Sequence, residues 1–258
     1  MTIGTSLTAA QTPHELLQRW DAQQAAYIRH RALRFDTMLR VLERIGNGRP
    51  RVLDLASGPG SLAAAVIERF PGAEVVCADK DPVLLAIARD VLGSTGRVTV
   101  VDADLNDPSW VGTVGGPFDA VVSSTALHWL QPEVLTRVYF ELAGLIRTGG
   151  VFLNGDHLCY DETSQPVLRQ VAADDDDATQ AEALGGGSDS WDEWWQSAEA
   201  QPAYALAVSE RAERWRGKLE APPKVTLEFH RAVLRSADFA EVGTVWQYLD
   251  DYVVYAVR

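Results

Sequence analysis

The sequence predicts an α/β fold in which a mainly parallel sheet is covered by helices on both faces. Three observations support this prediction. Short apolar segments, typical of strands buried on both faces, alternate with amphipathic helical segments between residues 51 and 155. A turn of small residues, Ala56 to Gly60, follows the first of these strands and opens a helix. Two short strand-like segments at the end of the chain are close enough together to form an antiparallel hairpin.

Each element is predicted from its periodicity and from the residues that end it. Apolar residues at helical spacing from Pro13 to Ile45, closed by Gly46-Asn47-Gly48, predict two helices ahead of the sheet. The alternating part then predicts strands at 51–55, 74–79, 97–102, 118–123 and 150–155, with helices at 60–69, 82–92 and 132–146. A helix at 228–237 and strands at 241–247 and 252–257 complete a seven-stranded mixed sheet.

The 258 residues, 47% of them hydrophobic, fit one globular body with added helices better than two independent domains. We predict an N-terminal helical cap (1–48), a core (49–158 and 224–258) and an inserted helical lid (159–223). Within the lid, Asp174–Asp177 and the hinge-like Gly185–Ser188 are expected to separate polar helices. Trp191, Trp194 and Trp195 share one helical face, which either packs the helix on the body or forms an aromatic wall for a ligand.

Composition excludes several classes of protein. A net charge of −13 disfavours a nucleic-acid partner, because phosphate binding needs clustered basic residues. No apolar run reaches the roughly 18 residues that span a bilayer, and no secretion signal is evident, so we expect a cytoplasmic monomer or homodimer that does not bind membranes. Cys77 and Cys159 read as small core residues. The Asp174–Asp177 run reads as a solvated, flexible acidic segment, and no metal site is expected.

Polar groups follow four successive strands and therefore meet at one edge of the predicted sheet. Gly58 and Gly60 allow the backbone to approach a ligand closely, and the N-terminus of the following helix favours negative charge. Asp79 ends the second strand, where a carboxylate can accept hydrogen bonds from both hydroxyls of a ribose. Asp104 and Ser123 follow or end the next two strands. These features predict a site for an adenosine-type cofactor.

With these residues in view, the chain resembles the class I S-adenosylmethionine-dependent methyltransferases that act on small molecules, including those similar to trans-aconitate methyltransferase. The resemblance extends from Trp20 to Arg258 and implies a Rossmann-like fold. Asp54 to Gly60 is similar to the family's first motif, Asp79 matches its ribose-binding acid, and Asp104 lies near its adenine-binding acid. Phe118–Trp129 and Leu145–Gly150 are similar to the motifs at the fourth strand and before the fifth.

The resemblance implies S-adenosylmethionine as cofactor and S-adenosylhomocysteine as product. The residues that it assigns to the cofactor are Tyr27, Arg31, Asp54, Ala56, Ser57, Gly58, Gly60, Asp79, Lys80, Ala103, Asp104, Leu105 and Ser123. Ala56 stands where the family has a glycine, and an alanine is tolerated there if its φ is negative. Tyr27 and Arg31 are expected to close over the cofactor, with Arg31 pairing its carboxylate, although a core tyrosine and a solvated arginine explain these residues equally well.

His128 and His157, near the ends of the fourth and fifth strands, are the candidate catalytic bases. Methyl transfer is an in-line displacement, and it needs a base only if the acceptor arrives protonated. Either histidine has the alternative of binding the lid or the substrate without titrating. The main hypothesis is methylation of an oxygen, nitrogen or carbon of a small apolar or aromatic metabolite. The alternatives are a protein that uses the cofactor structurally and a nicotinamide-dependent oxidoreductase, which the terminal hairpin disfavours.

Overall fold

A seven-stranded mixed sheet organises the chain, as predicted. The computed structural model describes residues 11–45, 48–217, 223 and 225–258, and the strand order is β3-β2-β1-β4-β5-β7-β6. The strands are β1 (Arg51–Leu55), β2 (Glu74–Asp79), β3 (Val98–Asp102), β4 (Phe118–Ser124), β5 (Ile146–His157), β6 (Glu241–Tyr248) and β7 (Asp251–Val257). β1 to β5 are parallel, and β7 runs antiparallel to both β5 and β6. The terminal hairpin is therefore confirmed.

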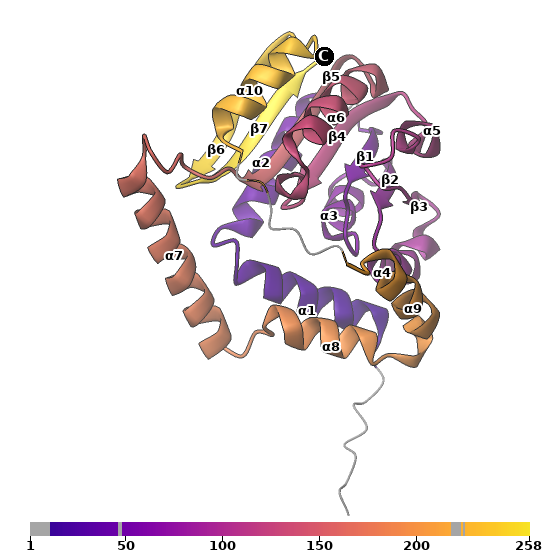
Figure 1. The fold of residues 1–258 in the computed structure, drawn as a ribbon. Coiled ribbons are helices and arrows are strands. Elements are labelled where there is room, and N and C mark those ends of the chain that lie inside the picture. Colours follow the sequence, from indigo (N-terminus) through magenta and orange to yellow (C-terminus); the bar gives the residue numbers. More distant parts are fainter. Residues whose placement is uncertain (1–10, 46–47, 218–222, 224) are drawn as a thin grey trace, which may run out of the picture.

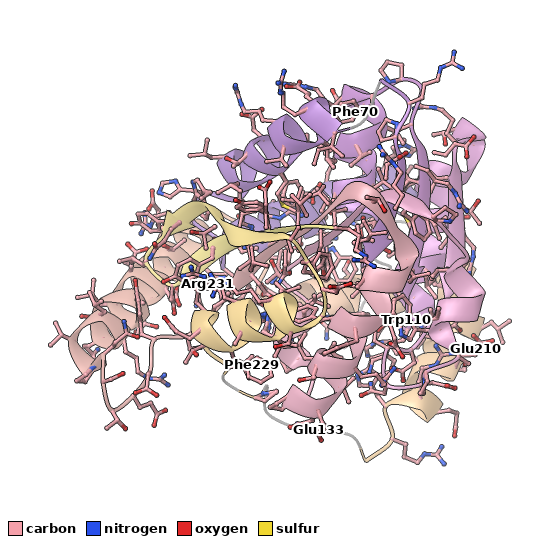
Figure 2. The ribbon with its side chains drawn as sticks, turned by 90° about the horizontal axis from the view of Figure 1, so that it is seen from above. Phe70, Trp110, Glu133, Glu210, Phe229 and Arg231 are labelled. Atoms are coloured by element: carbon pink, nitrogen blue, oxygen red, sulfur yellow. The ribbon has the colours of Figure 1, made fainter. Side chains whose placement is uncertain are left out.

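Helices cover both faces of the sheet and bury two apolar clusters. One face carries α2 (Arg31–Ile45), α3 (Ser61–Arg69) and α4 (Pro82–Leu92). The other carries α5 (Trp110–Val114), α6 (Pro132–Leu145) and α10 (Leu227–Ser236). Figure 2 shows this separation, because Phe70, at the end of α3, and Phe229, on α10, lie on opposite flanks of the molecule. Strands buried on both faces explain the uninterrupted apolar segments of the sequence.

The N-terminal helix and the insertion lie beyond the carboxyl ends of the parallel strands. In Figure 1 the antiparallel β7 ends at the top, so β5 and the strands parallel to it end at the bottom, toward α1 (Pro13–Ala25) and α8 (Trp191–Glu199). The rings of Trp20 and Trp194 are 4.6 Å apart, and the Trp194 indole N–H donates to the carbonyl of Leu16 at 3.0 Å. The buried Trp194 and Trp195 thus pack α8, as the first of the two interpretations predicted, and the surface that they pack against is α1.

Three sequence predictions need correction. The Asp174–Asp177 run does not separate helices but lies inside α7 (Pro166–Gly185), where Arg29 pairs with Asp175 at 3.0 Å and offsets part of the negative charge. Cys77 is a buried core residue, whereas Cys159 lies beyond the end of β5 and is only half-buried. The fifth strand was predicted to begin at residue 150, but β5 begins at Ile146, which pairs with Phe118 on β4. The register then shifts before Val151 pairs with Ala120.

The remaining elements are short or lie in the insertion. They are α9 (Ala205–Arg214) and the 3-10 turns η1 (Gly93–Thr95), η2 (Leu127–Trp129) and η3 (Pro202–Tyr204). The predicted turn at 46–48 and the end of the predicted lid at 218–223 fall partly outside the described residues. Within the described ranges, no helix combines the length and the apolar character needed to cross a bilayer.

Candidate active site

The turn after β1 has the backbone shape that its glycines predicted. Gly58 and Gly60 have φ values of 55° and 92°, in the left-handed region that glycine adopts without strain. A Cβ atom on Gly60 would lie 2.5 Å from Cδ1 of Leu92 on α4. Glycine at position 60 therefore lets α3 and α4 pack closely, while Gly58 gives the turn its shape at the carboxyl edge of the sheet.

Asp79 joins this turn to the end of β2. Its Oδ2 accepts a hydrogen bond from the Gly58 N–H at 2.8 Å, and its Oδ1 accepts one from the Asp81 N–H at 2.8 Å. A carboxylate oxygen can accept more than one hydrogen bond, so each oxygen keeps capacity for a hydroxyl donor. Burial raises the pKa of Asp79 to about 6, against the hydrogen bonds from Asp81 and Gly58, which lower it.

Ala56 does not meet the condition under which an alanine is tolerated without strain, because its φ is 54°. For a residue with a Cβ, the left-handed conformation brings that atom close to the backbone carbonyl and costs about 1–2 kcal/mol. Ala56 directly follows β1 in the turn that carries Gly58, so the backbone shape that the family's glycine would allow is retained here with strain.

Replacing Ala56 with glycine is expected to stabilise the protein by about 0.5–1 kcal/mol. The relief of strain, about 1–2 kcal/mol, exceeds the roughly 0.5–1 kcal/mol by which glycine favours the unfolded chain. Chemical denaturation measures the free energy of unfolding, and Ala64→Gly in the middle of α3 is the matched control, expected to lose about 1 kcal/mol. If Ala56→Gly destabilises the protein as much as the control does, position 56 is not strained.

Asp54, at the end of β1, is buried beneath the turn. Its Oδ2 accepts a hydrogen bond from the Ala63 N–H of α3 at 2.9 Å, which ties the strand to the helix that follows. Burial raises the pKa of Asp54 to about 7, and that hydrogen bond only partly opposes the rise. Asp54 therefore holds the turn in place from below.

The pKa of Asp54 predicts how stability depends on pH. Because the folded protein binds this proton more tightly than the unfolded chain, Asp54 contributes stability below about pH 4, and the contribution is lost as the pH rises through about 7. Asp54→Asn can still accept from Ala63 and does not titrate. Unfolding free energies measured from about pH 4 to pH 8 should fall less in this variant than in the wild type. Identical pH dependence in the two proteins would contradict the assignment.

The other residues assigned to the cofactor surround this turn, with one exception. Lys80 Nζ lies 3.8 Å from Oδ1 of Asp104, which brings the ends of β2 and β3 together. The Ala103 N–H donates to the carbonyl of Asp79 at 2.8 Å, and the Ser57 N–H donates to the carbonyl of Ala78 at 3.0 Å. Leu105 is buried after β3, where its carbonyl accepts from Arg137 at 2.6 Å.

Ser123 is the exception. Its hydroxyl donates to the carbonyl of Leu55 at 2.8 Å and is fully buried between β4 and β1. The structure gives this side chain a role within the sheet, and its contact with a cofactor stays a prediction.

The insertion covers the ends of β2 and β3 through two arginines of α9. Arg214 forms two hydrogen bonds to the carboxylate of Asp102, both 2.8 Å long. Arg211 pairs with Asp81 at 2.8 Å, and its guanidinium lies 3.7 Å from the centre of the Trp195 ring. The two ion pairs have no local signal in the sequence, because each joins residues more than 100 positions apart.

Arg31 lies close to the turn but already has an acidic partner. It pairs with Asp21 at 2.9 Å and lies over the ring of Phe35 at 4.5 Å. Arg31 and Ser61, the first residue of α3, both line a cavity of about 400 Å³ between α1, α2 and α3. Tyr27 follows α1 and is half-buried. The binding of a cofactor carboxylate by Arg31 stays a prediction.

His128 forms a tight pair with a buried carboxylate. Its Nδ1 lies 2.6 Å from Oδ1 of Asp156, and its backbone N–H donates to Oδ2 of the same residue at 3.1 Å. Because an ionised carboxylate only accepts, Nδ1 carries the proton, and Nε2 of the neutral ring carries the free lone pair. The His128 side chain is 19% exposed, while that of Asp156 is fully buried.

The two partners shift each other's pKa. Burial alone would raise the pKa of Asp156, but the adjacent His128 more than reverses this and lowers it to about 2. Burial opposes the charged imidazole of His128, and the Asp156 carboxylate outweighs that effect and raises the pKa of His128. An imidazole held in one tautomer by a carboxylate has the arrangement of a general base.

His157 lies in a different environment. In the antiparallel pairing of β5 and β7, it lies opposite Asp251. Its backbone N–H donates to Oδ1 of Asp156 at 3.0 Å. Burial raises the pKa of Asp176, on α7, to about 6, and His157 partly offsets that rise. His157 therefore lies near the carboxylates of Asp176, on α7, and Asp251, on β7. His128, in contrast, has the carboxylate that orients a base.

Asp156 was missed by the sequence analysis, although a signal for it existed. A carboxylate at the end of a strand was taken as informative on β2 and β3, and the same rule applies to Asp156 near the end of β5. Its pairing with His128 was not predictable, because it depends on the path of the backbone between the end of β4 and η2.

Comparisons with known proteins agree with this geometry. Residues 52–150, which form most of the parallel sheet, match the family described as a methyltransferase domain. Within this segment the chain is similar to class I S-adenosylmethionine-dependent methyltransferases. The matched segment contains the glycine-rich turn, Asp79 and His128.

Curated relatives match part of the chain. The chain is 31% identical over 159 residues to trans-aconitate 2-methyltransferase of Streptomyces avermitilis, which is 59% of this chain and 56% of that protein. It is 33% identical over 120 residues to malonyl-[acyl-carrier protein] O-methyltransferase of Geobacter sulfurreducens, 44% of this chain and 43% of that one. The chain thus spans about half the length of these relatives.

Solved structures share the fold of this chain. An O-methyltransferase family protein from Burkholderia thailandensis aligns with a TM-score of 0.55 at 19% identity, over 97% of this chain and 73% of that one. The S-adenosylmethionine-dependent methyltransferase SibL aligns with a TM-score of 0.53 at 20% identity, over 81% of this chain and 50% of that one.

Proposed function

We propose that this chain transfers the methyl group of S-adenosylmethionine to a protonated oxygen or nitrogen of a small-molecule acceptor, and that His128 removes the acceptor's proton. The observation that carries the proposal is the His128–Asp156 pair, 2.6 Å apart, at the same sheet edge as the turn that contains Gly58. Asp156 holds Nδ1 protonated, so Nε2 is the atom that accepts a proton.

The residues around the turn fit the cofactor. Asp79 retains hydrogen-bonding capacity for ribose hydroxyls, the positive φ of Gly58 opens the backbone, and Arg31 borders the cavity at the start of α3. When bound, S-adenosylmethionine supplies an electrophilic methyl group on a sulfonium. The task of the protein is then to align the acceptor, exclude water and take up the proton.

A second candidate function is the methylation of a carboxylate. The curated relatives are named for trans-aconitate and for a malonyl group, and both of these are carboxylic acids. A carboxylate acceptor arrives ionised, and methyl transfer to it needs alignment but no base.

Product analysis separates these functions. The protein is incubated with methyl-labelled S-adenosylmethionine and, separately, with panels of phenols, amines and small carboxylic acids. Label in an ether or an N-methyl product supports the first function, and label in a methyl ester supports the second. If S-adenosylmethionine binds but no panel takes up label, a structural use of the cofactor is favoured.

A further inference from the structure

The arginine at position 34 is the most unusual buried charge in the described part of the chain. Arg34 lies on α2, its side chain has no solvent exposure, and it extends under the carboxyl ends of β4 and β5. Its Nη1 donates to Oδ1 of Asp251 at 2.7 Å, and its Nη2 donates to the hydroxyls of Ser124, at 2.9 Å, and Thr125. A buried guanidinium requires such partners, because removing it from water costs several kcal/mol.

The sheet is built to admit this side chain. A Cβ atom on Gly155 would lie 3.0 Å from Nε of Arg34 and 3.1 Å from its Cδ, which is closer than nearly all side-chain contacts. The glycine at this point of β5 therefore leaves room for the arginine between the strand and α2.

Thr125 links Arg34 to the candidate base. Its φ is 55°, in the left-handed region, which is strongly unfavourable for a β-branched residue. The surroundings hold it there from two sides, since its N–H donates to the Gly155 carbonyl at 2.8 Å and its hydroxyl accepts from Arg34. Three residues later, His128 donates its backbone N–H to Asp156.

We propose that Arg34 is a positioning residue that holds the strained Thr125 turn and thereby fixes the imidazole of His128 against Asp156. The inference rests on the proposed role of His128. It gives α2 a second role at the site, besides that of Arg31, which lines the cavity beside α3. Arg34 does not touch the acceptor, and it acts through the backbone between β4 and η2.

The charge of Arg34 and its geometry act in opposite directions on the pKa of His128. Burial lowers that pKa, Asp156 outweighs this effect and raises it, and the Arg34 charge acts with burial to lower it. The other titratable groups that face the pair are His157, which lowers the pKa of Asp156, and His230 on α10, whose own pKa burial lowers to about 4. Loss of the guanidinium removes a charge that lowers the pKa of His128 and loosens the contact with Asp156 that raises it, so the tautomer of His128 is the decisive readout.

Nuclear magnetic resonance of the histidine rings tests this proposal without a known acceptor. In protein labelled with ¹⁵N-histidine, two-bond ¹H–¹⁵N spectra report the tautomer and the pKa of each ring, and His128→Gln assigns the signal. The main variant is Arg34→Met/Asp251→Asn, because removing only one member of a buried ion pair leaves an uncompensated charge and risks unfolding. Arg40→Met, on the exposed side of α2, is the matched control.

The wild type and Arg40→Met should show a single His128 tautomer, with the proton on Nδ1. The double variant should show mixed His128 tautomers. Arg34→Lys, which keeps the charge but loses the planar fork, should also show mixed tautomers, at a lower His128 pKa than in the double variant. This variant carries the test if the double variant does not fold.

A folded variant whose His128 keeps the single wild-type tautomer would overturn the positioning role. Failure of the proposed function has a different signature, because it appears as absence of methyl transfer in the wild type. The binding of S-adenosylhomocysteine, which does not involve Arg34, should be equal in all of these proteins.

Discussion

Replacing His128 with glutamine should lower kcat for a hydroxyl or amine acceptor by about 10²–10⁴-fold, the range for loss of a general base, with little change in KM. The amide keeps a donor toward Asp156 but cannot take up a proton at the position of Nε2. The effect is measured from initial rates of methyl transfer, with methyl-labelled S-adenosylmethionine and the acceptor that the panel identifies as substrates.

The pH dependence of kcat gives this prediction a second readout. A base works only when deprotonated, and Asp156 raises the pKa of His128. The rate should therefore fall with decreasing pH from a point above the usual pKa of histidine, and His128→Gln should lose that fall. The exposed His14→Gln on α1 is the control and should keep the wild-type rate. Full activity in His128→Gln would instead support the carboxylate acceptor, which needs no base.

Replacing Asp79 with alanine should weaken the binding of S-adenosylhomocysteine by about 1.5–3 kcal/mol, roughly 10- to 150-fold in Kd. The loss includes the ribose contacts and the Asp79 carboxylate that orders the Gly58 amide at 2.8 Å. Isothermal titration calorimetry measures it, and Asp192→Asn on α8 serves as a control of equal charge change. Undiminished affinity in Asp79→Ala would show that the ribose hydroxyls of the ligand do not bind Asp79.

The affinity of the wild type for S-adenosylhomocysteine should also depend on pH. Burial raises the pKa of Asp79 to about 6, and only the ionised carboxylate accepts freely from two hydroxyls. Binding should weaken as the pH falls through about 6, because protonation of Asp79 then competes with the ligand. A Kd that stays constant through this range in the wild type would show that Asp79 does not titrate in the free protein.

The sheet could be predicted from the sequence because its signals are local. The apolar segments from Val75 to Ala78 and from Ala120 to Val122 leave no polar face, and a strand with no polar face must be buried on both sides. The terminal hairpin followed from two short strands with a tight turn at Leu249–Asp250, and the structure pairs Tyr248 with Asp251. The helices of the insertion were harder to predict. The acidic run in α7 pairs through Asp175 with Arg29, which is far away in sequence.

The site divides in the same way. Gly58, Gly60 and Asp79 could be proposed from the sequence because each lies at a strand end or in a turn where local chemistry limits the choice of residue. Asp156 and Arg34 act through partners on other elements, so no local pattern distinguishes them from an ordinary strand-end acid and an ordinary helical arginine. The sign of φ at Ala56 could not be predicted, because only the closed turn shows that a left-handed residue is required there.

A crystal structure with S-adenosylhomocysteine bound tests the central claim most directly, because it locates the ribose and the sulfur relative to the residues that the proposal uses. We predict that the ribose hydroxyls donate to Asp79 and that the sulfur faces the space into which Nε2 of His128 points. A ribose bound away from Asp79, or a sulfur that faces neither His128 nor His157, would contradict the account.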